Sequence, residues 1–324
     1  MAVSNHVVEE HIQAWETKLG ASYRRRWPSR LFRHEVLENA IKILKAGKLY
    51  SRGDAVDLLE RDVAPEDIIN ITHAAHGYTR LYFRPRTPTQ YRIEGIRRAE
   101  EIWNGRHAPV LYMFVFKARS LLTRADVHFS RGNMQIPGTP ILDGDAAFKT
   151  LAFGKIYHEG RYNPEDPDEA DIKIWRCAEV LCESPLLIDD ALEAVVCRSD
   201  AERKTLIYAL GEEGPKWAPR IRIVSQPGYF NAEYAFVESV DLTSKGVSVR
   251  FHPRRSLPVE GNVKLVADNI DDFADTRTFK RQPLDLRSGW DFPFKVSEGS
   301  YRITIHIEDE IAYQNILFYE EDPF

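Results

Sequence analysis

The sequence has few cysteines and methionines, no long hydrophobic run and no internal repeat. Its three cysteines, Cys177, Cys182 and Cys197, lack the fourth ligand and the Cys-x-x-Cys spacing of a zinc site, so we expect reduced, buried thiols and no metal. No apolar stretch approaches the roughly 20 residues of a membrane helix. The first residues are acidic and polar where a signal peptide has a basic end and an apolar stretch, so we expect a cytoplasmic protein with no membrane segment.

The composition is that of a soluble globular protein. The chain has 324 residues, of which 43% are hydrophobic and 29% are charged, which excludes a disordered chain and a collagen-like repeat. This length exceeds that of most single domains. A polar segment rich in glycine and proline, residues 211–219, separates two patterns of hydrophobicity. We therefore predict one domain over residues 1–212 and a second over residues 213–324.

The first domain combines helical and strand patterns. Apolar residues spaced three and four apart predict a helix around residues 37–44, and residues 172–180 fit a helical face less well. The uninterrupted apolar run at residues 110–116 and the segment at residues 79–83 predict buried strands. These patterns predict a mixed α/β domain.

The second domain consists of short alternating segments separated by turn residues. They lie at residues 221–225, 235–242, 247–251, 263–267, 301–307 and 314–319. Six or seven such strands in about 105 residues predict an antiparallel, immunoglobulin-like β-sandwich. A true immunoglobulin domain is excluded because the Cys…Trp…Cys pattern is absent. The predicted fold class of the whole chain is therefore α+β.

The net charge of −5 hides an asymmetry along the chain. Residues 21–135 contain 21 Lys and Arg against 12 Asp and Glu, whereas residues 136–213 contain 8 against 17. The basic segment suggests a face for phosphate groups, and its densest cluster is formed by Arg24, Arg25, Arg26 and Arg30. The alternative is that the two segments neutralise each other within one domain.

Residues Leu81–Tyr91, LYFRPRTPTQY, form what we call the proline–arginine segment. Two prolines flank Arg86, and each restricts the residue before it, which favours a stiff exit from a strand. The rings of Tyr82 and Tyr91 beside the guanidinium groups of Arg84 and Arg86 are typical of a nucleotide or phosphate site. One alternative for this segment is a plain surface loop. For the two tyrosines, the alternative is core packing on a strand.

Glu179 lies within the otherwise apolar run AEVLC. A carboxylate in such a run is costly to bury unless it is partnered or functional, which makes Glu179 a candidate catalytic residue. The alternative is a glutamate on the solvent side of an amphipathic helix.

Four motifs, in order along the chain, resemble those of the DarT family of NAD-dependent DNA ADP-ribosyltransferase toxins. The proline–arginine segment resembles the family signature FYFxPRSPMLY, and WRCAEVLC at residues 175–182 resembles RRQAEFLV. RHEVLENAIKILKAGKL at residues 33–49 resembles the opening motif HITHIDNLxxILxxGxL, and HFSRGNM at residues 128–134 resembles FTDGNA. The resemblance covers about residues 30–210, and the β-rich domain is additional to the usual single-domain enzyme.

The resemblance implies an ADP-ribosyltransferase-like fold, NAD as co-substrate and Glu179 as the catalytic carboxylate. We expect NAD to contact residues of the opening motif and of the proline–arginine segment, namely His34, Asn39, Tyr82, Arg86 and Tyr91. We expect DNA contacts at Arg84, Arg131 and Asn133. The family also has an arginine between its first helix and the FYF strand, for which the candidates here are Arg52, Arg61 and Arg80.

The resemblance thus predicts transfer of ADP-ribose from NAD to a base of DNA. Because the reactive edge of a base is paired inside a duplex, the enzyme acts on single strands or flips the base out of the duplex, and we expect single-stranded DNA. The resemblance implies a toxin whose partner is an antitoxin that removes the ADP-ribose. Three alternatives remain open: an RNA or protein acceptor, a non-catalytic nucleic-acid-binding protein and a metal-dependent nuclease. The sequence does not identify which base is modified.

Overall fold

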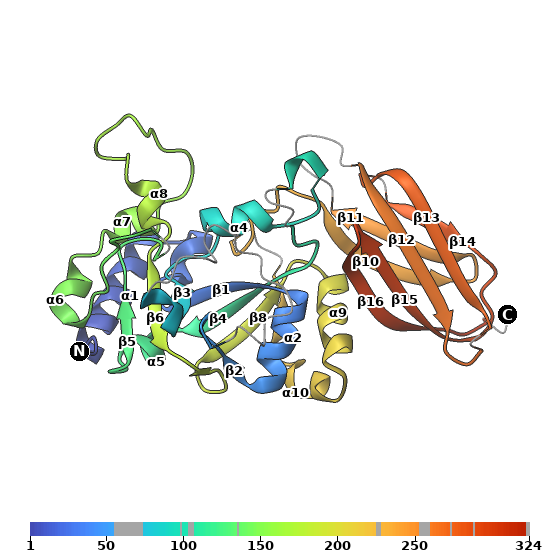
Figure 1. The fold of residues 1–324 in the computed structure, drawn as a ribbon, viewed down its shortest axis with the longest axis horizontal. Helices are drawn as coiled ribbons and strands as arrows, with labels where there is room; N and C mark the ends of the chain where they lie inside the picture. The colour runs from blue at the N-terminus through green and yellow to red at the C-terminus, as the bar shows by residue number, and fades with distance from the viewer. Residues whose placement is uncertain are drawn as a thin grey trace. The chain divides into compact units, whose positions relative to one another are not determined.

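The computed structural model describes residues 1–54, 74–97, 99–102, 107–134, 136–224, 228–252, 260–272, 274–287 and 289–321. The chain divides into two compact units, each assembled from separate stretches (Figure 1). Unit 1 consists of Met1–Tyr91, Met113–Val195 and Gln226–Tyr229, and unit 2 consists of Arg92–Tyr112, Val196–Ser225 and Phe230–Phe324. The predicted domain boundary after residue 212 stays a prediction.

The main sheet has, among the described residues, seven strands in the order β5-β6-β3-β1-β4-β8-β9. Their bounds are β1 (Arg30–Val36), β3 (Tyr78–Tyr82), β4 (Leu111–Lys117), β5 (Val127–Phe129), β6 (Glu179–Glu183), β8 (Leu192–Cys197) and β9 (Ile221–Ile223). The pairs β1–β3, β3–β6 and β5–β6 are antiparallel. The short strands β2 (Lys48–Leu49) and β7 (Leu186–Leu187) form a separate pair. The strands predicted at residues 79–83 and 110–116 are confirmed as β3 and β4.

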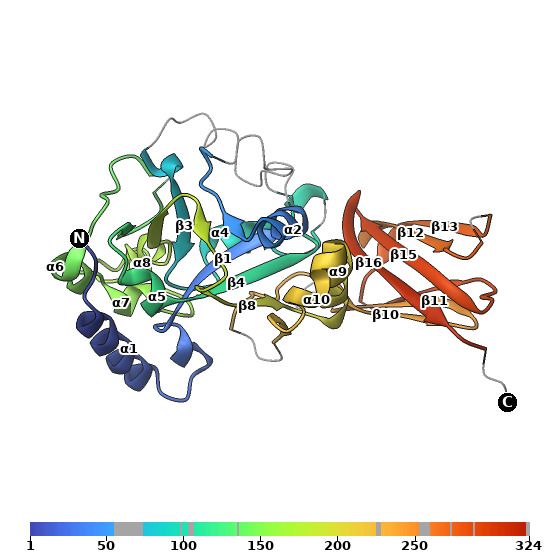
Figure 2. The ribbon, with the colours of Figure 1, turned by 90° about the horizontal axis from the view of Figure 1, so that it is seen from below.

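Helix α2 (Leu37–Ala46) confirms the predicted helix and lies beside β1 (Figure 2). It ends at Gly47, whose φ of +63° is a left-handed conformation that glycine adopts without steric cost. Helix α1 (Asn5–Leu19) begins at Ser4, whose side chain accepts a hydrogen bond from the backbone N–H of Val7. The other helices among the described residues are η1 (Tyr23–Arg26), η2 (Ala74–Gly77), α4 (Pro88–Ile93), η3 (Ala99–Glu101), α5 (Ala118–Leu122), α6 (Gly144–Lys149), α7 (Phe153–Ile156), α8 (Ile172–Trp175), α9 (Asp200–Leu210), η4 (Gly211–Glu213) and α10 (Gly214–Trp217).

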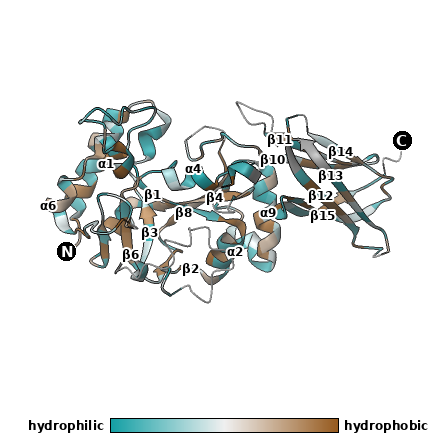
Figure 3. Ribbon diagram, turned by 45° about the horizontal axis from the view of Figure 1, so that its top comes forward, coloured by the Kyte–Doolittle hydropathy of each residue, from teal (hydrophilic) through white to brown (hydrophobic). Residues whose placement is uncertain are grey.

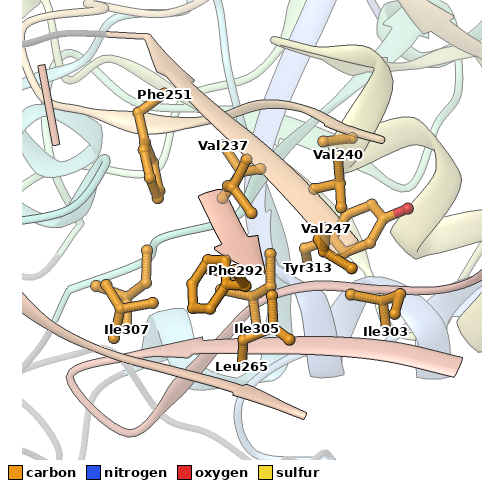
Figure 4. Close-up of a cluster of buried hydrophobic side chains, with 14 of the residues drawn as sticks. Val237, Val240, Val247, Phe251, Leu265, Phe292, Ile303, Ile305, Ile307 and Tyr313 are labelled. Atoms are coloured by element: carbon orange, nitrogen blue, oxygen red, sulfur yellow. The ribbon is translucent and has the colours of Figure 1, made fainter. Parts of the chain in front are cut away.

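Two antiparallel sheets form a β-sandwich in unit 2, with the described strands in the orders β10-β11-β14 and β13-β12-β15-β16. Their bounds are β10 (Phe236–Thr243), β11 (Gly246–His252), β12 (Glu260–Asn269), β13 (Thr276–Asp285), β14 (Trp290–Pro293), β15 (Gly299–Ile307) and β16 (Glu310–Tyr319). Side chains from both sheets meet in one hydrophobic core that includes Val237, Val247, Leu265 and Ile305 (Figure 4). The predicted β-sandwich is therefore confirmed.

The sandwich departs from the immunoglobulin constant domain at its fourth strand. In the constant domain the fourth strand joins the first, second and fifth strands. Here the fourth strand, β13, instead pairs with the third, β12, so that Leu265 lies opposite Phe279. The three-stranded sheet consequently holds the first, second and fifth strands, and the four-stranded sheet holds the rest.

Two sequence predictions are wrong in detail. The strand predicted at residues 221–225 forms β9 of the main sheet rather than part of the sandwich, whose strands β13 and β14 were not predicted. Residues 172–180 do not form one helix, because α8 ends at Trp175 and strand β6 begins at Glu179. The first four residues of β6 are all buried, and such a short apolar run looks the same in a buried helix and a buried strand.

The hydrophobic residues concentrate on the strands of the sheets, as the colour of β4 and β6 shows (Figure 3). The three cysteines are free and buried, as predicted. Within the described ranges, no helix is long and apolar enough to cross a membrane. No group of three or more His, Cys, Asp or Glu in the same ranges is arranged to hold a metal ion.

A buried ion pair at the start of α9 yields a first prediction. Arg198 and Glu202 are 2% and 1% exposed, and burial raises the pKa of Glu202 while Arg198 lowers it. Replacing Arg198 with alanine leaves a buried carboxylate without its cation, so we expect a loss of about 3–5 kcal/mol in the free energy of unfolding. Chemical denaturation measures this loss. Lys204→Ala is the control: it removes the exposed pair with Asp200, and an equal loss there would contradict the prediction.

Candidate active site

Glu179 is the first residue of β6 and its side chain is fully buried. Its Oε2 accepts a hydrogen bond from the backbone N–H of Met134 at 3.3 Å. Its Oε1 has no hydrogen-bond partner among the described residues. The backbone of Glu179 is fixed by Ser130, whose N–H donates to the Glu179 carbonyl at 2.9 Å and whose hydroxyl accepts from the Glu179 N–H at 3.3 Å. A rigid backbone thus presents a buried carboxylate with one unused acceptor.

Arg80 supplies the positive charge nearest to this carboxylate. Its Nη1 lies 3.7 Å from Oε2 of Glu179, and its side chain is 19% exposed. Burial raises the pKa of Glu179, whereas Arg80, the N–H of Met134, Arg33 and Tyr82 lower it. The net effect is that the pKa of the Glu179 carboxyl lies above its ordinary value. The ionised form is stabilised by Arg80, whose side chain is partly exposed to solvent.

Sheet register explains why Arg80, Tyr82 and His34 meet Glu179. Tyr82 lies directly opposite Glu179 across the β3–β6 pair and opposite Phe32 across the β1–β3 pair. Because side chains alternate between the faces of a strand, Arg80 shares the face of Tyr82. The rings of His34 and Tyr82 stack, with centroids 5.8 Å apart and planes inclined by 8°.

Burial determines the protonation of both stacked rings. It lowers the pKa of His34 to about 3, with a smaller contribution from Arg33, so the imidazole is neutral at physiological pH. Burial and, to a smaller extent, Glu179 raise the pKa of Tyr82. The phenol therefore stays protonated and presents a hydroxyl beside the carboxylate. The predicted site residues Glu179, Tyr82 and His34 thus lie together.

Arg86 lies in a tight turn that follows β3. It has a φ of +57°, a left-handed conformation that is uncommon for a residue with a side chain. Its Nη1 donates to the hydroxyl of Tyr23 at 3.1 Å and pairs with Oε2 of Glu159 at 3.1 Å. Its buried Nε has no hydrogen-bond partner among the described residues. Arg86 therefore has one buried donor without an acceptor among the described residues.

Arg84, for which the sequence suggests a DNA contact, is buried in this structure. Its side chain is 2% exposed and pairs with Glu159, and its Nε donates to the Pro85 carbonyl at 2.9 Å. Its Nη1 donates to the carbonyls of Ile156 and His158. A guanidinium with these buried acceptors is not presented to phosphates in this structure. These contacts tie β3 to the segment around Glu159, and the DNA contact of Arg84 stays a prediction.

Asn39 lies on α2, buried beside Glu35. Its Nδ2 donates to Oε2 of Glu35 at 3.3 Å, and Oε1 of Glu35 accepts from Nε of Arg33. Nη1 of Arg33 also donates to the carbonyl of Arg80 at 3.0 Å. Asn39 thus belongs to a polar network that reaches the strand of Arg80.

The other predicted site residues are more exposed. Tyr91 lies on α4 and is 44% exposed. Arg131 is exposed, and Asn133 is half-buried in the loop that ends at Met134. This loop donates the Met134 N–H to Glu179, so Arg131 and Asn133 are three residues or fewer along the chain from a direct contact with the carboxylate.

Sequence reasoning missed several residues of this site. Gln90 lies within the proline–arginine segment, but the sequence gives it no role, and Glu159 has no pattern that distinguishes it from a surface glutamate. Arg80 was one of three candidates for the family arginine, and the structure pairs it with Glu179. Arg52 lies in the turn after β2, and Arg61 lies outside the described residues. The alternation of β3, which puts Arg80 on the face of Tyr82, was the available signal.

The charge asymmetry of the sequence resolves into ion pairs within unit 1. Arg30 pairs with Glu193, Arg84 and Arg86 pair with Glu159, and Arg80 pairs with Glu179. Each of these pairs joins the basic segment to the acidic segment. For these arginines, mutual neutralisation within one domain is the correct interpretation.

The fold and this site define a mixed α/β enzyme unit built around a buried carboxylate and extended by a β-sandwich. The family described as "ssDNA thymidine ADP-ribosyltransferase, DarT" matches residues 34–230, more than half of the chain. The chain therefore belongs to the DarT family. No curated protein sequence matches it at a significant level.

Solved structures of one relative are similar to the chain. Thermus sp. 2.9 DarT in complex with NAD+ has a TM-score of 0.47 and 17% identity over 61% of this chain and 96% of that chain. The same protein in complex with ADP-ribosylated ssDNA has a TM-score of 0.48 and 17% identity over 63% and 96%. Its complex with carba-NAD+ has a TM-score of 0.46 and 16% identity over 61% and 95%.

The pair of Arg80 and Glu179 yields a prediction about stability. Because the folded-state pKa of Glu179 is raised, the group destabilises the fold as pH increases from its unfolded pKa through its folded pKa. Arg80→Gln removes the nearest cation, so we expect an added loss of about 1–3 kcal/mol at pH 8 that is absent at pH 4, measured by chemical denaturation. In a Glu179→Gln background the Arg80→Gln loss should be equal at both pH values. A loss that depends on pH in that background would contradict the interpretation.

Proposed function

We propose that this chain transfers ADP-ribose from NAD to thymidine in single-stranded DNA, with Glu179 as the catalytic carboxylate. The observation that supports this proposal best is the geometry of Glu179: fully buried, held by a backbone N–H, paired with Arg80 and left with one free oxygen. Membership of a family of ssDNA thymidine ADP-ribosyltransferases supplies the reaction and its acceptor.

Glu179 suits both steps that the transfer requires. The bond between nicotinamide and ribose breaks, nicotinamide leaves with the electron pair, and positive charge develops on the ribose. A fixed, ionised carboxylate next to the ribose stabilises this charge. The base nitrogen then bonds to the anomeric carbon and loses its proton, which the same carboxylate accepts. The raised pKa of Glu179 favours the proton transfer, and Arg80 favours the ionised form needed first.

The residues around the carboxylate supply contacts for NAD. The neutral, stacked rings of His34 and Tyr82 offer a flat surface beside Glu179 for a ring of the dinucleotide. The free Nε of Arg86 offers a charged donor for the pyrophosphate. We assign Tyr91, which is exposed at the end of the proline–arginine segment, to the outer side of the same site. Asn39 acts through Glu35 and Arg33 rather than by direct contact.

The DNA strand would reach the site along the loop of Arg131 and Asn133. Arg131 is exposed, and the loop ends at the N–H that holds Glu179. A cation there would hold a phosphate of the strand, and binding would weaken as salt increases. Arg84 is left out of the DNA contacts because its guanidinium is buried.

Glu179→Gln tests the catalytic assignment. The substitution keeps the shape but removes the charge and the proton acceptor, so we expect turnover to fall about 10²–10⁴-fold. The assay incubates the protein with labelled NAD and a thymidine-containing single-stranded oligonucleotide, followed by mass spectrometry of the nucleosides. Glu183→Gln, at the exposed end of the same strand, is the matched control and should retain activity.

Parallel incubations with RNA and with protein test the acceptor. ADP-ribose on thymidine of the oligonucleotide supports the proposal. Label on RNA or protein alone would replace the DNA assignment, and full activity of the Glu179→Gln variant would remove the glutamate from the mechanism.

We also propose that the chain acts as a cytoplasmic toxin whose partner is an antitoxin that removes ADP-ribose from DNA. ADP-ribose on a template base blocks pairing, so a cell expressing the wild-type chain should stop replicating, whereas one expressing Glu179→Gln should grow. Colony counts after induction measure the difference. Co-expression of a hydrolase that removes ADP-ribose from thymidine should restore growth, and equal toxicity of both forms would contradict a toxin that acts through this reaction.

A further inference from the structure

The side chain of Gln90 is fully buried in unit 1 and hydrogen-bonded at both its oxygen and its nitrogen. Its Oε1 accepts the backbone N–H of Arg86 at 2.7 Å, and its Nε2 donates to the carbonyl of Tyr229 at 2.8 Å. Its own N–H donates to the hydroxyl of Thr87 at 3.2 Å. Gln90 is therefore bonded directly to the turn that contains Arg86.

The turn needs such support because of its backbone conformation. A left-handed φ is sterically unfavourable for arginine and persists only where surrounding contacts impose it. The Arg86 N–H is part-buried, and a donor removed from water without an acceptor is costly. The side chain of Gln90 supplies that acceptor.

The other end of Gln90 is anchored to the main sheet through Tyr229. The hydroxyl of Tyr229 accepts from Nη1 of Arg30 at 2.6 Å, and its ring lies 5.9 Å from that of Phe32. Phe32 lies opposite Tyr82, which lies opposite Glu179. Tyr229, which accepts the hydrogen bond of Gln90, therefore contacts the same cross-strand residues that position the Glu179 carboxylate.

We propose that Gln90 is a positioning residue that fixes the left-handed turn of Arg86 and so aims the Arg86 guanidinium for the pyrophosphate of NAD. This inference rests on the proposed function, in which Arg86 contacts NAD. Gln90 itself touches no substrate. Its effect is on the placement of Arg86 relative to Tyr23 and Glu159, which already hold Nη1 of that residue.

Gln90→Met tests the proposal, because methionine keeps the length of the side chain and removes both hydrogen bonds. We expect the KM for NAD and the Kd for NAD, measured by calorimetry without DNA, to increase about tenfold, corresponding to about one lost hydrogen bond. The kcat and the affinity for single-stranded DNA should change less than twofold. Gln314→Met is the matched control: it removes the hydrogen bond from Gln314 to Thr304 in the sandwich and should leave the NAD constants unchanged.

Two further variants separate the possible outcomes. Gln90→Glu keeps an acceptor for the Arg86 N–H, so it should recover most of the NAD affinity. This variant also tests the proposal if the methionine variant folds poorly. Arg86→Ala tests the proposed function: if it leaves the NAD constants unchanged, the assignment of Arg86 fails. If Arg86→Ala weakens NAD binding while Gln90→Met and Gln90→Glu both bind NAD as the wild type does, the positioning role of Gln90 fails and the proposed function stands.

Discussion

The structure around the site depends on one constraint, the burial of the charge on Glu179. A carboxylate removed from water is unfavourable unless hydrogen bonds and a cation replace its hydration. Here the N–H of Met134 and the guanidinium of Arg80 do so for one oxygen, and the other has no partner among the described residues. The loop from Ser130 to Met134 and the register of β3 against β6 both serve this arrangement. The contacts of Oε2 hold the Glu179 carboxylate in place, and Oε1 remains as an acceptor without a partner among the described residues.

Much of the fold could be predicted from periodicity. The helix of residues 37–44, the strands at β3 and β4 and the sandwich all follow from hydrophobic spacing and turn residues. The pattern was least reliable at residues 172–180, where one helical turn and a buried strand follow each other within a single apolar run. Strand β13 (Thr276–Asp285) is polar and basic over residues 276–280, where Phe279 packs against the core, and its strand pattern was missed.

The sequence predicted the candidate catalytic residue of the site, Glu179, better than it predicted the residues that hold Glu179 and Arg86 in place. Glu179 could be found because a carboxylate in an apolar run is costly, which is a local property of the sequence. The roles of Arg84 and Arg86 depend on which of them faces inward, and two arginines separated by one residue look alike in a sequence. Arg86 has a left-handed backbone conformation, and its guanidinium is partly exposed whereas that of Arg84 is buried, although both pair with Glu159. Partners distant in the sequence, such as Glu159, decide this outcome.

The pairing of charges also changes how the basic segment should act on DNA. Arg30, Arg80, Arg84 and Arg86 pair with three carboxylates, since Arg84 and Arg86 share Glu159, so most of their charge is balanced and their contribution to the field felt by an approaching strand is reduced. Attraction over distance must then come from exposed cations such as Arg25, Arg26 and Arg131. The paired arginines act at short range by shaping the turn and holding the catalytic carboxylate. The same residue type thus has two physical roles here, and burial decides between them.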